Sequence, residues 1–396
     1  MKKHISLIVF SIFLHLFGYY VLLNRIEPFQ YFFYLTSWWS YIIFLDALLT
    51  FKKKTFLIVN RRLPSLILIS CGFWCIFEII NLRIQNWFYI NLPVEVYKRY
   101  AGYLLSYGTV IPAIYITKEL IFTLFGEIKA KPFHIKNYPL YSISLGILTI
   151  LLTCLFPAYF FPLTWIFFAL IFDGYNYVRG YASFMKDFER GSMGNFIAAM
   201  ISGLICGLLW EIWNYWSISK WIYSVPLFED SKIFEMPIPG YIGFLVFGLE
   251  TLTLINFLNG RAVHKKSLYP ITLIATAISI LSFPMIDRYT VFSYATKIDK
   301  LSFIEQEKLS LFIAKGVKTS FGIDVNQLNE EEKELVALLH LKGLGYKNFS
   351  NLRKQGVKNI QELSKYDKET LSRIVEEKNI RRVRVYTKAA RRYNRQ

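Results

Sequence analysis

The chain has 396 residues, of which 54% are hydrophobic, 18% aromatic and 19% charged, and its formal net charge is +18. An average soluble domain holds about 45–50% apolar and about 25% charged residues, so this composition disfavours an ordinary soluble enzyme, a disordered chain and a collagen-like repeat. All four cysteines lie in apolar runs, which indicates neither a disulfide framework nor a cysteine metal site.

Nine apolar stretches approach or exceed the length of about 20 residues that a helix needs to cross a bilayer. They cover about 5–23, 29–50, 63–82, 100–125, 139–156, 157–178, 195–217, 238–258 and 268–289. The first stretch follows basic residues, as in a signal peptide, but no small-residue cleavage site follows it, so we expect an uncleaved membrane helix. The sequence therefore predicts an all-α, polytopic transmembrane helical bundle of about nine helices.

Lysine and arginine are unevenly divided between the two sets of loops. With the N-terminus inside, the inner segments hold sixteen of these residues and the outer loops hold six. This is a positive-inside bias, and it indicates a multi-pass protein of the cell membrane. The predicted inner segments include the loops near 52–62, 129–136, 179–190 and 261–266.

Nine crossings would leave the C-terminus outside, although the segment from 295 onward carries 22 Lys and Arg against 13 Asp and Glu. The ninth stretch has Pro270 and Pro284 near its two ends. We expect that this stretch is re-entrant or that one crossing is miscounted, which makes the C-terminal domain cytoplasmic.

The composition changes at about residue 295 to charged, glycine-punctuated helical sequence. Asn329 followed by Glu332 predicts a capping-box helix start. A glycine-containing turn at 342–345 separates this helix from the next. We expect residues 1–294 to form the transmembrane domain, 295–328 to be a linker, and 329–396 to form a small soluble basic domain.

Two parts of the membrane region share a spaced pattern, which indicates an internal duplication. Trp38 precedes Asp46 by eight residues, as Trp165 precedes Asp173. A second pattern recurs at offsets of 133 or 134 residues: Glu78, Asn81, Trp87, Tyr89, Pro93 and Tyr107 recur as Glu211, Asn214, Trp221, Tyr223, Pro226 and Tyr241. We expect repeats at about 29–156 and 157–289, with chance recurrence of abundant Trp and Tyr as the alternative.

Six carboxylates lie inside the predicted spans, where each would cost on the order of 2.5–3.5 kcal/mol at mid-membrane by insertion scales. Residues three apart are neighbours on a helix, so Glu78 shares a face with Asn81, and Glu211 with Asn214. Tryptophans surround both pairs, which predicts a functional pocket. The candidate catalytic residues are Glu78, Glu211, Asp46 and Asp173, and the candidate substrate contacts are Asn81, Asn214, Trp74, Trp210, Trp213, Glu119 and Glu250.

Each of these residues also has a structural explanation. The carboxylates and asparagines would then hold helices together by interhelical hydrogen bonds. Asp46 and Asp173 would pair with loop lysines near the membrane interface. Interfacial belts are the favoured interpretation for Trp38, Trp39 and Trp87.

A carboxyl group that apolar surroundings keep protonated can act as a general acid on a substrate with no other handle, such as a carbon–carbon double bond. Facing indole and phenol rings would stabilise the resulting carbocation, and a second carboxylate would remove the terminal proton. Buried carboxylates beside helices broken by Gly or Pro also suit a proton- or cation-coupled transporter. The two alternatives stay open at this point.

The order Glu-x-x-Asn, Trp-x-Tyr, Pro and a Gly-Tyr-opened helix, in two copies, resembles two-repeat membrane carotenoid-modifying proteins of the lycopene cyclase and bacterioruberin-precursor hydratase type. The resemblance extends loosely over residues 29–289. It implies an intramembrane acid-catalysed enzyme acting on an isoprenoid or other apolar lipid, with the acid role at Glu78 and Glu211.

The stretch Leu341-Lys342-Gly343-Leu344-Gly345-Tyr346-Lys347 resembles the helix-hairpin-helix module of nucleic-acid-binding proteins, in which a Gly-x-Gly turn points N–H groups at a phosphate. A basic stripe follows at helical spacing and ends at Arg395. The candidate phosphate contacts are Lys342, Gly343, Gly345, Lys347, Arg381, Arg384, Lys388 and Arg391. The partner would be anionic lipid or nucleic acid, which would make the bundle a membrane anchor; a merely solvated face is the third alternative.

The five histidines are scattered, and no glycine-rich nucleotide loop occurs in the chain. We therefore expect no metal site and no cofactor.

Overall fold

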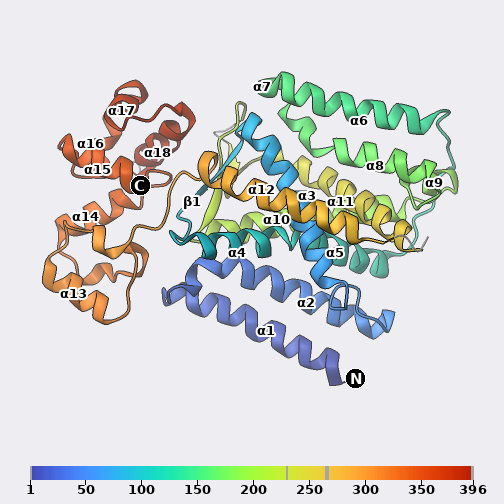
Figure 1. Ribbon diagram of the computed structural model, residues 1–396, viewed down its shortest axis with the longest axis horizontal. Helices are drawn as coiled ribbons and strands as arrows, with labels where there is room; N and C mark the ends of the chain where they lie inside the picture. The colour runs from blue at the N-terminus through green and yellow to red at the C-terminus, as the bar shows by residue number, and fades with distance from the viewer. Residues whose placement is uncertain (1, 229–230, 264–266, 394–396) are drawn as a thin grey trace.

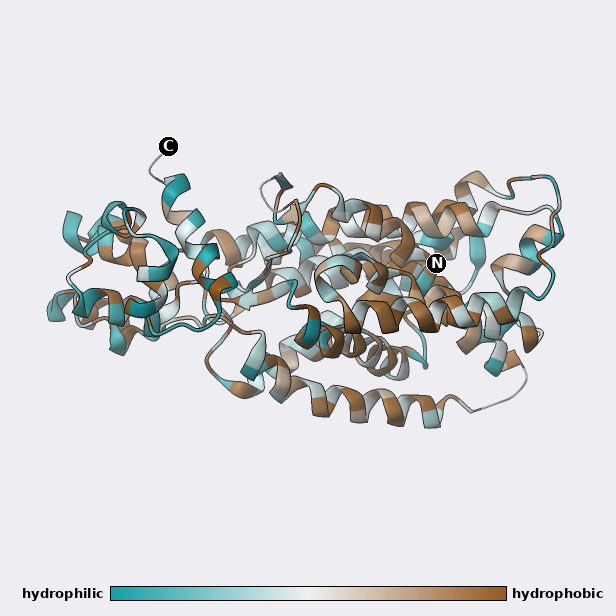
Figure 2. Ribbon diagram, turned by 90° about the horizontal axis from the view of Figure 1, so that it is seen from above, coloured by the Kyte–Doolittle hydropathy of each residue, from teal (hydrophilic) through white to brown (hydrophobic). Residues whose placement is uncertain are grey.

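The computed structural model describes residues 2–228, 231–263 and 267–393 (Figure 1). Arg395 of the predicted basic stripe and the loop residues 264–266 lie outside this range. A bundle of long helices makes up most of the molecule, and the C-terminal helices form a smaller part at one end of it (Figure 1). Hydrophobic residues concentrate in the bundle and hydrophilic ones in the C-terminal part (Figure 2).

The bundle follows the predicted apolar stretches. It consists of α1 (Lys2–Leu23), α2 (Phe33–Lys53), α3 (Leu63–Ile84), α4 (Val96–Tyr107), α5 (Val110–Phe125), α6 (Tyr138–Leu155), α7 (Pro157–Phe160), α8 (Phe167–Val178), α9 (Phe184–Glu189), α10 (Gly194–Trp216), α11 (Gly240–Val263) and α12 (Tyr269–Tyr289). A 3-10 turn, η1 (Phe29–Phe32), precedes α2, and another, η2 (Phe161–Trp165), precedes α8.

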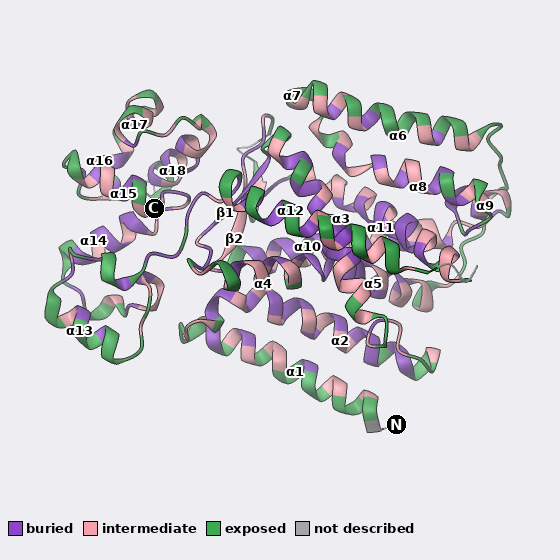
Figure 3. Cartoon of the chain, viewed as in Figure 1, coloured by how far each residue is buried: buried purple, intermediate pink, exposed green. Residues whose placement is uncertain are grey.

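Within the described chain, eight helical segments are long and apolar enough to cross a membrane, or nine if one bent pair counts as a single span. Many of their apolar side chains are exposed, as along the outer face of α6 (Figure 3). Such a surface is unfavourable in water and suits lipid. The prediction of an all-α, polytopic helical bundle is confirmed, and the chain is a multi-pass membrane protein in contact with the lipid bilayer.

A break in the membrane helix was expected in the ninth apolar stretch, at 268–289, but the structure has a bent pair of helices in the sixth, at 157–178. Residues Pro157–Trp165 and Phe167–Val178 meet at 45°. In contrast, α12 is one unbroken helix of 21 residues, so the expectation that this stretch is re-entrant is wrong. Pro270 lies in its first turn, where a missing N–H costs little, and Pro284 is accommodated inside the helix.

Short strands connect the two halves of the bundle. β1 (Trp87–Ile90) pairs antiparallel with β2 (Lys220–Tyr223), with Trp87 opposite Tyr223. A second small pair, β3 (Lys232–Ile233) and β4 (Met236–Pro237), follows β2. The chain leaving α12 runs beside β1, where Phe292 N donates to Tyr89 O at 2.7 Å.

The C-terminal part contains α13 (Gln306–Ala314), α14 (Glu330–Leu339), α15 (Gly345–Lys354), α16 (Ile360–Ser364), α17 (Lys368–Ile374) and α18 (Ile380–Tyr393), with the 3-10 turns η3 (Ile298–Lys300), η4 (Ser320–Gly322) and η5 (Val325–Gln327). The capping box at the start of α14 is confirmed: Asn329 Oδ1 accepts from Glu332 N, and Glu332 Oε2 accepts from Asn329 N, each at 2.9 Å.

Residues 295–328 do not form the expected linker. Leu301, Phe312 and Ile323 are buried in the same hydrophobic core as Leu338 and Leu363 of the later helices. Burial of these apolar side chains lowers the free energy of the folded state. A linker outside the core would have left them exposed to water.

The C-terminal part contacts the loops at one end of the bundle. Arg25 Nη1 donates to Ile323 O at 2.8 Å, and Arg381 Nη1 donates to Gln85 O at 2.6 Å. Arg384 Nη2 lies 3.4 Å from Val225 O. These loops, 24–28, 85–95 and 217–239, are the ones with few lysines and arginines, whereas the lysine-rich loops lie at the opposite end (Figure 1).

Candidate functional site

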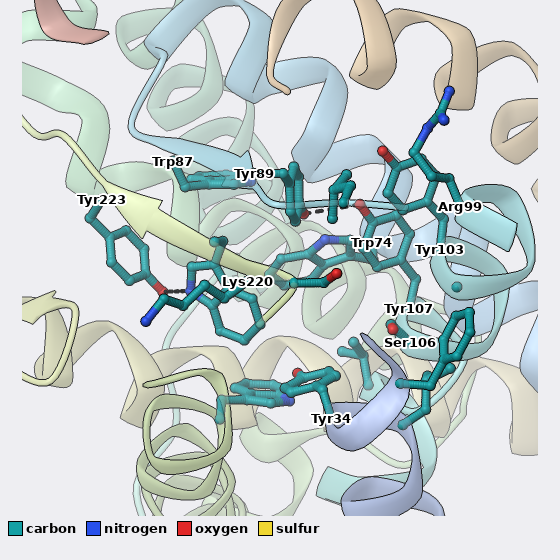
Figure 4. A pocket seen from close by; sticks show the side chains of 18 of the residues that line it. Tyr34, Trp74, Trp87, Tyr89, Arg99, Tyr103, Ser106, Tyr107, Lys220 and Tyr223 are labelled. Carbon is teal, nitrogen blue, oxygen red and sulfur yellow. Dashed lines mark hydrogen bonds between the residues drawn. The ribbon is translucent and has the colours of Figure 1, made fainter. Parts of the chain in front are cut away.

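A large aromatic cavity lies between α2, α3, α4, α10, α11 and the β1–β2 pair, with an empty volume of ≈ 1170 Å³ including its open mouth (Figure 4). Its wall holds many indole and phenol rings, together with the cationic residues Lys98, Arg99 and Lys220. The tryptophans are Trp74, Trp87, Trp165, Trp210 and Trp221, and the tyrosines are Tyr31, Tyr34, Tyr89, Tyr103, Tyr107 and Tyr223. A cavity of this composition suits an apolar ligand.

Glu78 lies directly behind this wall. Its Oε1 accepts three hydrogen bonds, from Trp74 Nε1 at 2.8 Å, Trp87 Nε1 at 3.0 Å and Tyr89 OH at 2.6 Å. Glu78 Oε2 is buried with no hydrogen-bond partner among the described residues. Tyr107 OH donates to Tyr89 OH at 2.9 Å (Figure 4), so a chain of hydroxyl groups connects the cavity to the carboxyl group.

The local fold of this half explains why these side chains converge. Trp74 precedes Glu78 by one helical turn on α3. Asn81 then fixes the path of the chain after α3: its Oδ1 accepts from Asn86 N at 2.9 Å, and its Nδ2 donates to Trp87 O at 2.8 Å. Alternate strand residues share a face, so Trp87 and Tyr89 of β1 both turn toward Glu78.

The second half repeats these contacts around Glu211. Asn214 Oδ1 accepts from Trp221 N, and Asn214 Nδ2 donates to Trp221 O, each at 2.9 Å. Tyr223 OH donates to Glu211 Oε1 at 3.1 Å, and Trp221 Nε1 donates to Tyr223 OH at 2.9 Å. The indole therefore reaches the carboxyl group only through the tyrosine, and Gly207 stands one helical turn before Glu211, where Trp74 stands before Glu78.

The strand tyrosines are suited to donate. Burial is the main cause that raises the pKa of Tyr89 and of Tyr223 well above the usual value, and the nearby Glu78 and Glu211 charges raise them further. Both hydroxyl groups therefore keep their protons at neutral pH.

Asp46 and Asp173 lie away from this cavity and hold loops at the opposite end of the bundle. Asp46 accepts from the backbone N–H groups of Leu57 at 2.7 Å and Val59 at 2.6 Å. Asp173 accepts from Phe184 N at 2.8 Å and from the hydroxyl group of Tyr138 at 2.7 Å. The hydrogen bonds of both carboxylates thus come from backbone and tyrosine rather than from loop lysines.

Glu119 and Glu250 are also separate from the cavity. Glu119 forms ion pairs with Lys53 and with Lys118. Glu250 Oε1 accepts from Phe168 N at 3.0 Å, in the first turn of α8, where the backbone N–H groups have no partner within the helix. The structure therefore brings Glu78 and Glu211 behind one cavity and leaves the other four carboxylates outside it.

Several tryptophans are interior residues, whereas Trp216 at the end of α10 is exposed. Trp38 and Trp87 are buried, so the expectation that they form interfacial belts is wrong for these two. Trp38 packs on Trp210 with ring centroids 5.6 Å apart and on Trp213 at 4.8 Å, outside the cavity wall. Trp165 packs in the same way on Phe77 of the other half, at 5.4 Å. Each half of the bundle thus places one indole against the other half.

Several residues of the site were not singled out from the sequence as functional. Tyr89, Tyr107 and Tyr223 belonged to the recurring pattern, which was interpreted only as a sign of duplication. Arg99 counted only as a loop charge, yet Arg99 Nη2 forms an ion pair with Asp287 Oδ2 at 2.5 Å beside the cavity. A recurring tyrosine at a fixed distance from a recurring buried glutamate was the signal that could have found the first three.

The predicted phosphate-binding residues mostly face the membrane domain. Lys342 forms an ion pair with Glu235, and Arg381 and Arg384 donate to loop carbonyl groups. Gly343 and Gly345 adopt φ of +77° and +72°, which explains why the turn needs glycine. Lys347 and Arg391 are exposed, and Lys388 lines a second cavity.

Among residues 2–228, 231–263 and 267–393, no group of three or more His, Cys, Asp or Glu could hold a metal ion.

The resemblances to carotenoid-modifying proteins and to the helix-hairpin-helix module stay predictions after comparison with known proteins. No protein-family model, no curated protein and no solved structure matches the chain.

Proposed function

We propose that this protein is an intramembrane enzyme that binds an isoprenoid or other apolar lipid in the aromatic cavity and transfers protons to and from it. The observation that carries the proposal is the hydrogen-bonded series Tyr107, Tyr89 and Glu78, which leads from the cavity wall to a buried carboxyl group. An apolar substrate offers no charge or polar group for recognition, so shape and ring contacts would bind it.

In the proposed reaction, the carboxyl group of Glu78 begins protonated and gives its proton to Tyr89, Tyr89 gives its proton to Tyr107, and Tyr107 protonates a carbon–carbon double bond, which leaves Glu78 as a carboxylate. The two hydroxyl groups must first turn, because in the structure Tyr107 donates to Tyr89 and Tyr89 donates to Glu78. The carbocation that forms is stabilised by the faces of the surrounding indole and phenol rings, through cation–π attraction. Loss of a proton from a neighbouring carbon, or addition of water, then completes an isomerisation, a cyclisation or a hydration. The Tyr223 and Glu211 pair is the candidate acceptor for the departing proton.

The matching contacts of the two halves support the predicted duplication. Asn81 and Asn214 bind the following strand in the same way, and Asp46 and Asp173 both bind the loop that begins eleven residues later. These parallels also support the resemblance to two-repeat carotenoid-modifying proteins, which implies an acid role at Glu78 or Glu211; we assign that role to Glu78 and the role of the base to Glu211.

The far-end carboxylates favour an enzyme over a transporter. A proton or cation path would need polar groups leading from the cavity to the opposite end. Asp46 and Asp173 are instead bound to backbone N–H groups, and Glu119 is paired with lysines. Such groups are satisfied by their partners and have structural roles.

The loops that the C-terminal domain contacts support a different location for it. The domain binds the lysine-poor end of the bundle, and the positive-inside rule, which counts short loops, favours the side opposite the cytosol for that end. We therefore propose an extracytoplasmic location for this domain, in place of the cytoplasmic one predicted from its own charge, in a protein of the cell membrane. An extracytoplasmic domain would meet anionic lipid rather than nucleic acid.

Impermeant thiol labelling of intact cells checks this location. Cysteine placed at Ser310, which is exposed in the C-terminal domain, should react with a membrane-impermeant maleimide without permeabilisation. Cysteine placed at Lys136, in the lysine-rich loop before α6, should react only after permeabilisation. Labelling of both positions on the same side, or the reverse order, would contradict the assignment.

The enzymatic proposal is tested by incubating membranes that contain the protein with an acyclic polyene such as lycopene, and separately by assaying ion-dependent flux in vesicles. Product that depends on the protein, without flux, is the expected result. Flux without product would favour the transporter.

A further inference from the structure

Another cavity lies next to the aromatic one, where the C-terminal domain meets the loops after α1 and β1, with an empty volume of ≈ 950 Å³ including its mouth. We call it the junction cavity. Its described lining differs from the aromatic wall because it holds six charged side chains: Glu27, Glu95, Lys98, Lys297, Asp299 and Lys318. An apolar chain is therefore suited to the aromatic cavity and not to the junction cavity.

A shared wall separates the two cavities. Among the described residues, Tyr31, Pro93 and Lys98 line both of them. Tyr31 supplies the aromatic ring of this wall and is buried, with 7% of its surface exposed. Lys98 is a weaker barrier, because its long side chain forms only a partly exposed ion pair with Glu95 at 3.3 Å. On this side, the aromatic cavity thus ends mainly on the Tyr31 ring.

Hydrogen bonds to the C-terminal domain hold this ring in place. Thr319 donates its hydroxyl proton to Glu27, so Tyr31 OH is the donor in its 2.5 Å contact with Thr319 Oγ1. Glu27 also accepts from Lys318 N and from Gln30 Nε2, each at 3.1 Å. A polar network whose members have their partners specifies one arrangement, so the position of the ring is fixed from both domains.

We propose that Tyr31 is a specificity-determining residue that sets the longest chain accepted by the aromatic cavity, with its ring held by the contact to Thr319. The ligand class is a linear isoprenoid whose end lies against this ring. A longer chain would have to displace the ring, and forcing extra groups into a filled space is unfavourable. The inference rests on the apolar ligand of the proposed function and does not depend on proton transfer.

Displacement of all-trans-retinol from the full-length protein in neutral detergent tests the proposal. Retinol accepts excitation energy from nearby indoles, so its emission reports occupancy of a cavity lined by five tryptophans. The competitors are linear isoprenoid alcohols from geraniol to solanesol, each one isoprene unit longer than the last. They are compared at equal mole fraction in the micelles, which cancels their partition into detergent. We expect a length limit, beyond which the next alcohol binds about tenfold more weakly.

Substitutions of the ring should move this limit in opposite directions, which misfolding would not do. Tyr31→Ala joins the two cavities and should shift the limit at least one isoprene unit longer, whereas Tyr31→Trp should shift it shorter. Tyr31→Phe keeps the ring but not its hydroxyl contacts, so the limit should stay while the tenfold penalty beyond it falls. The matched control Tyr138→Ala removes a ring whose hydroxyl group binds Asp173 at the opposite end of the bundle, and it should keep the limit and the penalty.

The outcomes separate this inference from the enzymatic proposal. The expected shifts without product in the polyene assay would support the role of Tyr31 and contradict only the enzyme. A series without a length limit, or a limit that is the same in Tyr31→Ala, Tyr31→Trp and the unmodified chain, would overturn the inference. If retinol binds to none of these proteins, the cavity takes no apolar chain, and the inference is overturned together with the proposed ligand.

Discussion

Glu78→Gln is expected to lower the rate of product formation from an acyclic polyene by about 10²–10⁴-fold, the usual contribution of a general acid or base. Glutamine keeps an oxygen that can accept from Trp74, Trp87 and Tyr89, so the aromatic wall should stay in place. It cannot release or take up the proton, so the relay should fail while the fold persists. The rate is measured in membranes with equal amounts of folded protein.

Glu250→Gln provides the matched control, because it makes the same substitution at a buried glutamate outside the cavity. It should retain most of the activity. Tyr107→Phe removes the hydroxyl group at the cavity end of the relay, and it should lose activity as Glu78→Gln does. Equal losses in Glu250→Gln and Glu78→Gln would show that the effect is structural and would contradict the role of Glu78.

Arg99→Met is expected to destabilise the protein by about 3–5 kcal/mol, the typical cost of removing one partner from a buried ion pair. The Arg99 and Asp287 side chains are 6% and 14% exposed, and Tyr103 OH also donates to Asp287, at 2.8 Å. Without the guanidinium group, the carboxylate would be left without its charged partner between α4 and α12. The free energy of unfolding in detergent, measured by denaturant titration, checks this value.

Lys98→Met is the control at the next position. The Lys98 and Glu95 side chains are 18% and 39% exposed and 3.3 Å apart, so the loss should be about 0–1 kcal/mol. The double variant Arg99→Met/Asp287→Leu should recover much of the lost stability, because no unpaired charge remains. A single Arg99→Met variant as stable as the Lys98 variant would contradict the assignment.

The long elements of this protein could be predicted because their signals are local. Apolar length identified the stretches that became α1 to α8 and α10 to α12, and Asn329 with Glu332 identified the start of α14. The stretch 295–328 was harder to interpret, since the residues that its apolar side chains pack against lie later in the chain.

The candidate site could be predicted only in part. Sequence spacing placed Glu78 beside Asn81 and Trp74, and these are close in the structure. Sequence spacing could not show that Glu78 and Asp46 have different roles, because both are acids in an apolar stretch. The two side chains differ in their hydrogen-bond partners. Asp46 is bound by backbone N–H groups of the following loop, whereas Glu78 is bound by rings of the cavity wall.

The basic residues of the C-terminal domain show the same limit. Lys342 and Arg381 looked suited to bind a phosphate because of the turn and the helical spacing beside them. In the fold they bind Glu235 and the carbonyl group of Gln85 instead. A charge pattern predicts that a surface binds something acidic or polar, but it does not say that the partner belongs to the same chain.

Deuterium incorporation from solvent tests the central role of the relay most directly. Membranes containing the protein are incubated with an acyclic polyene in ²H₂O, and the product is analysed by mass spectrometry. Proton delivery through Tyr107, Tyr89 and Glu78 predicts a product that carries solvent deuterium on carbon, and far less of it with Glu78→Gln. A product without deuterium, or one formed equally by the Glu78→Gln variant, would contradict the account.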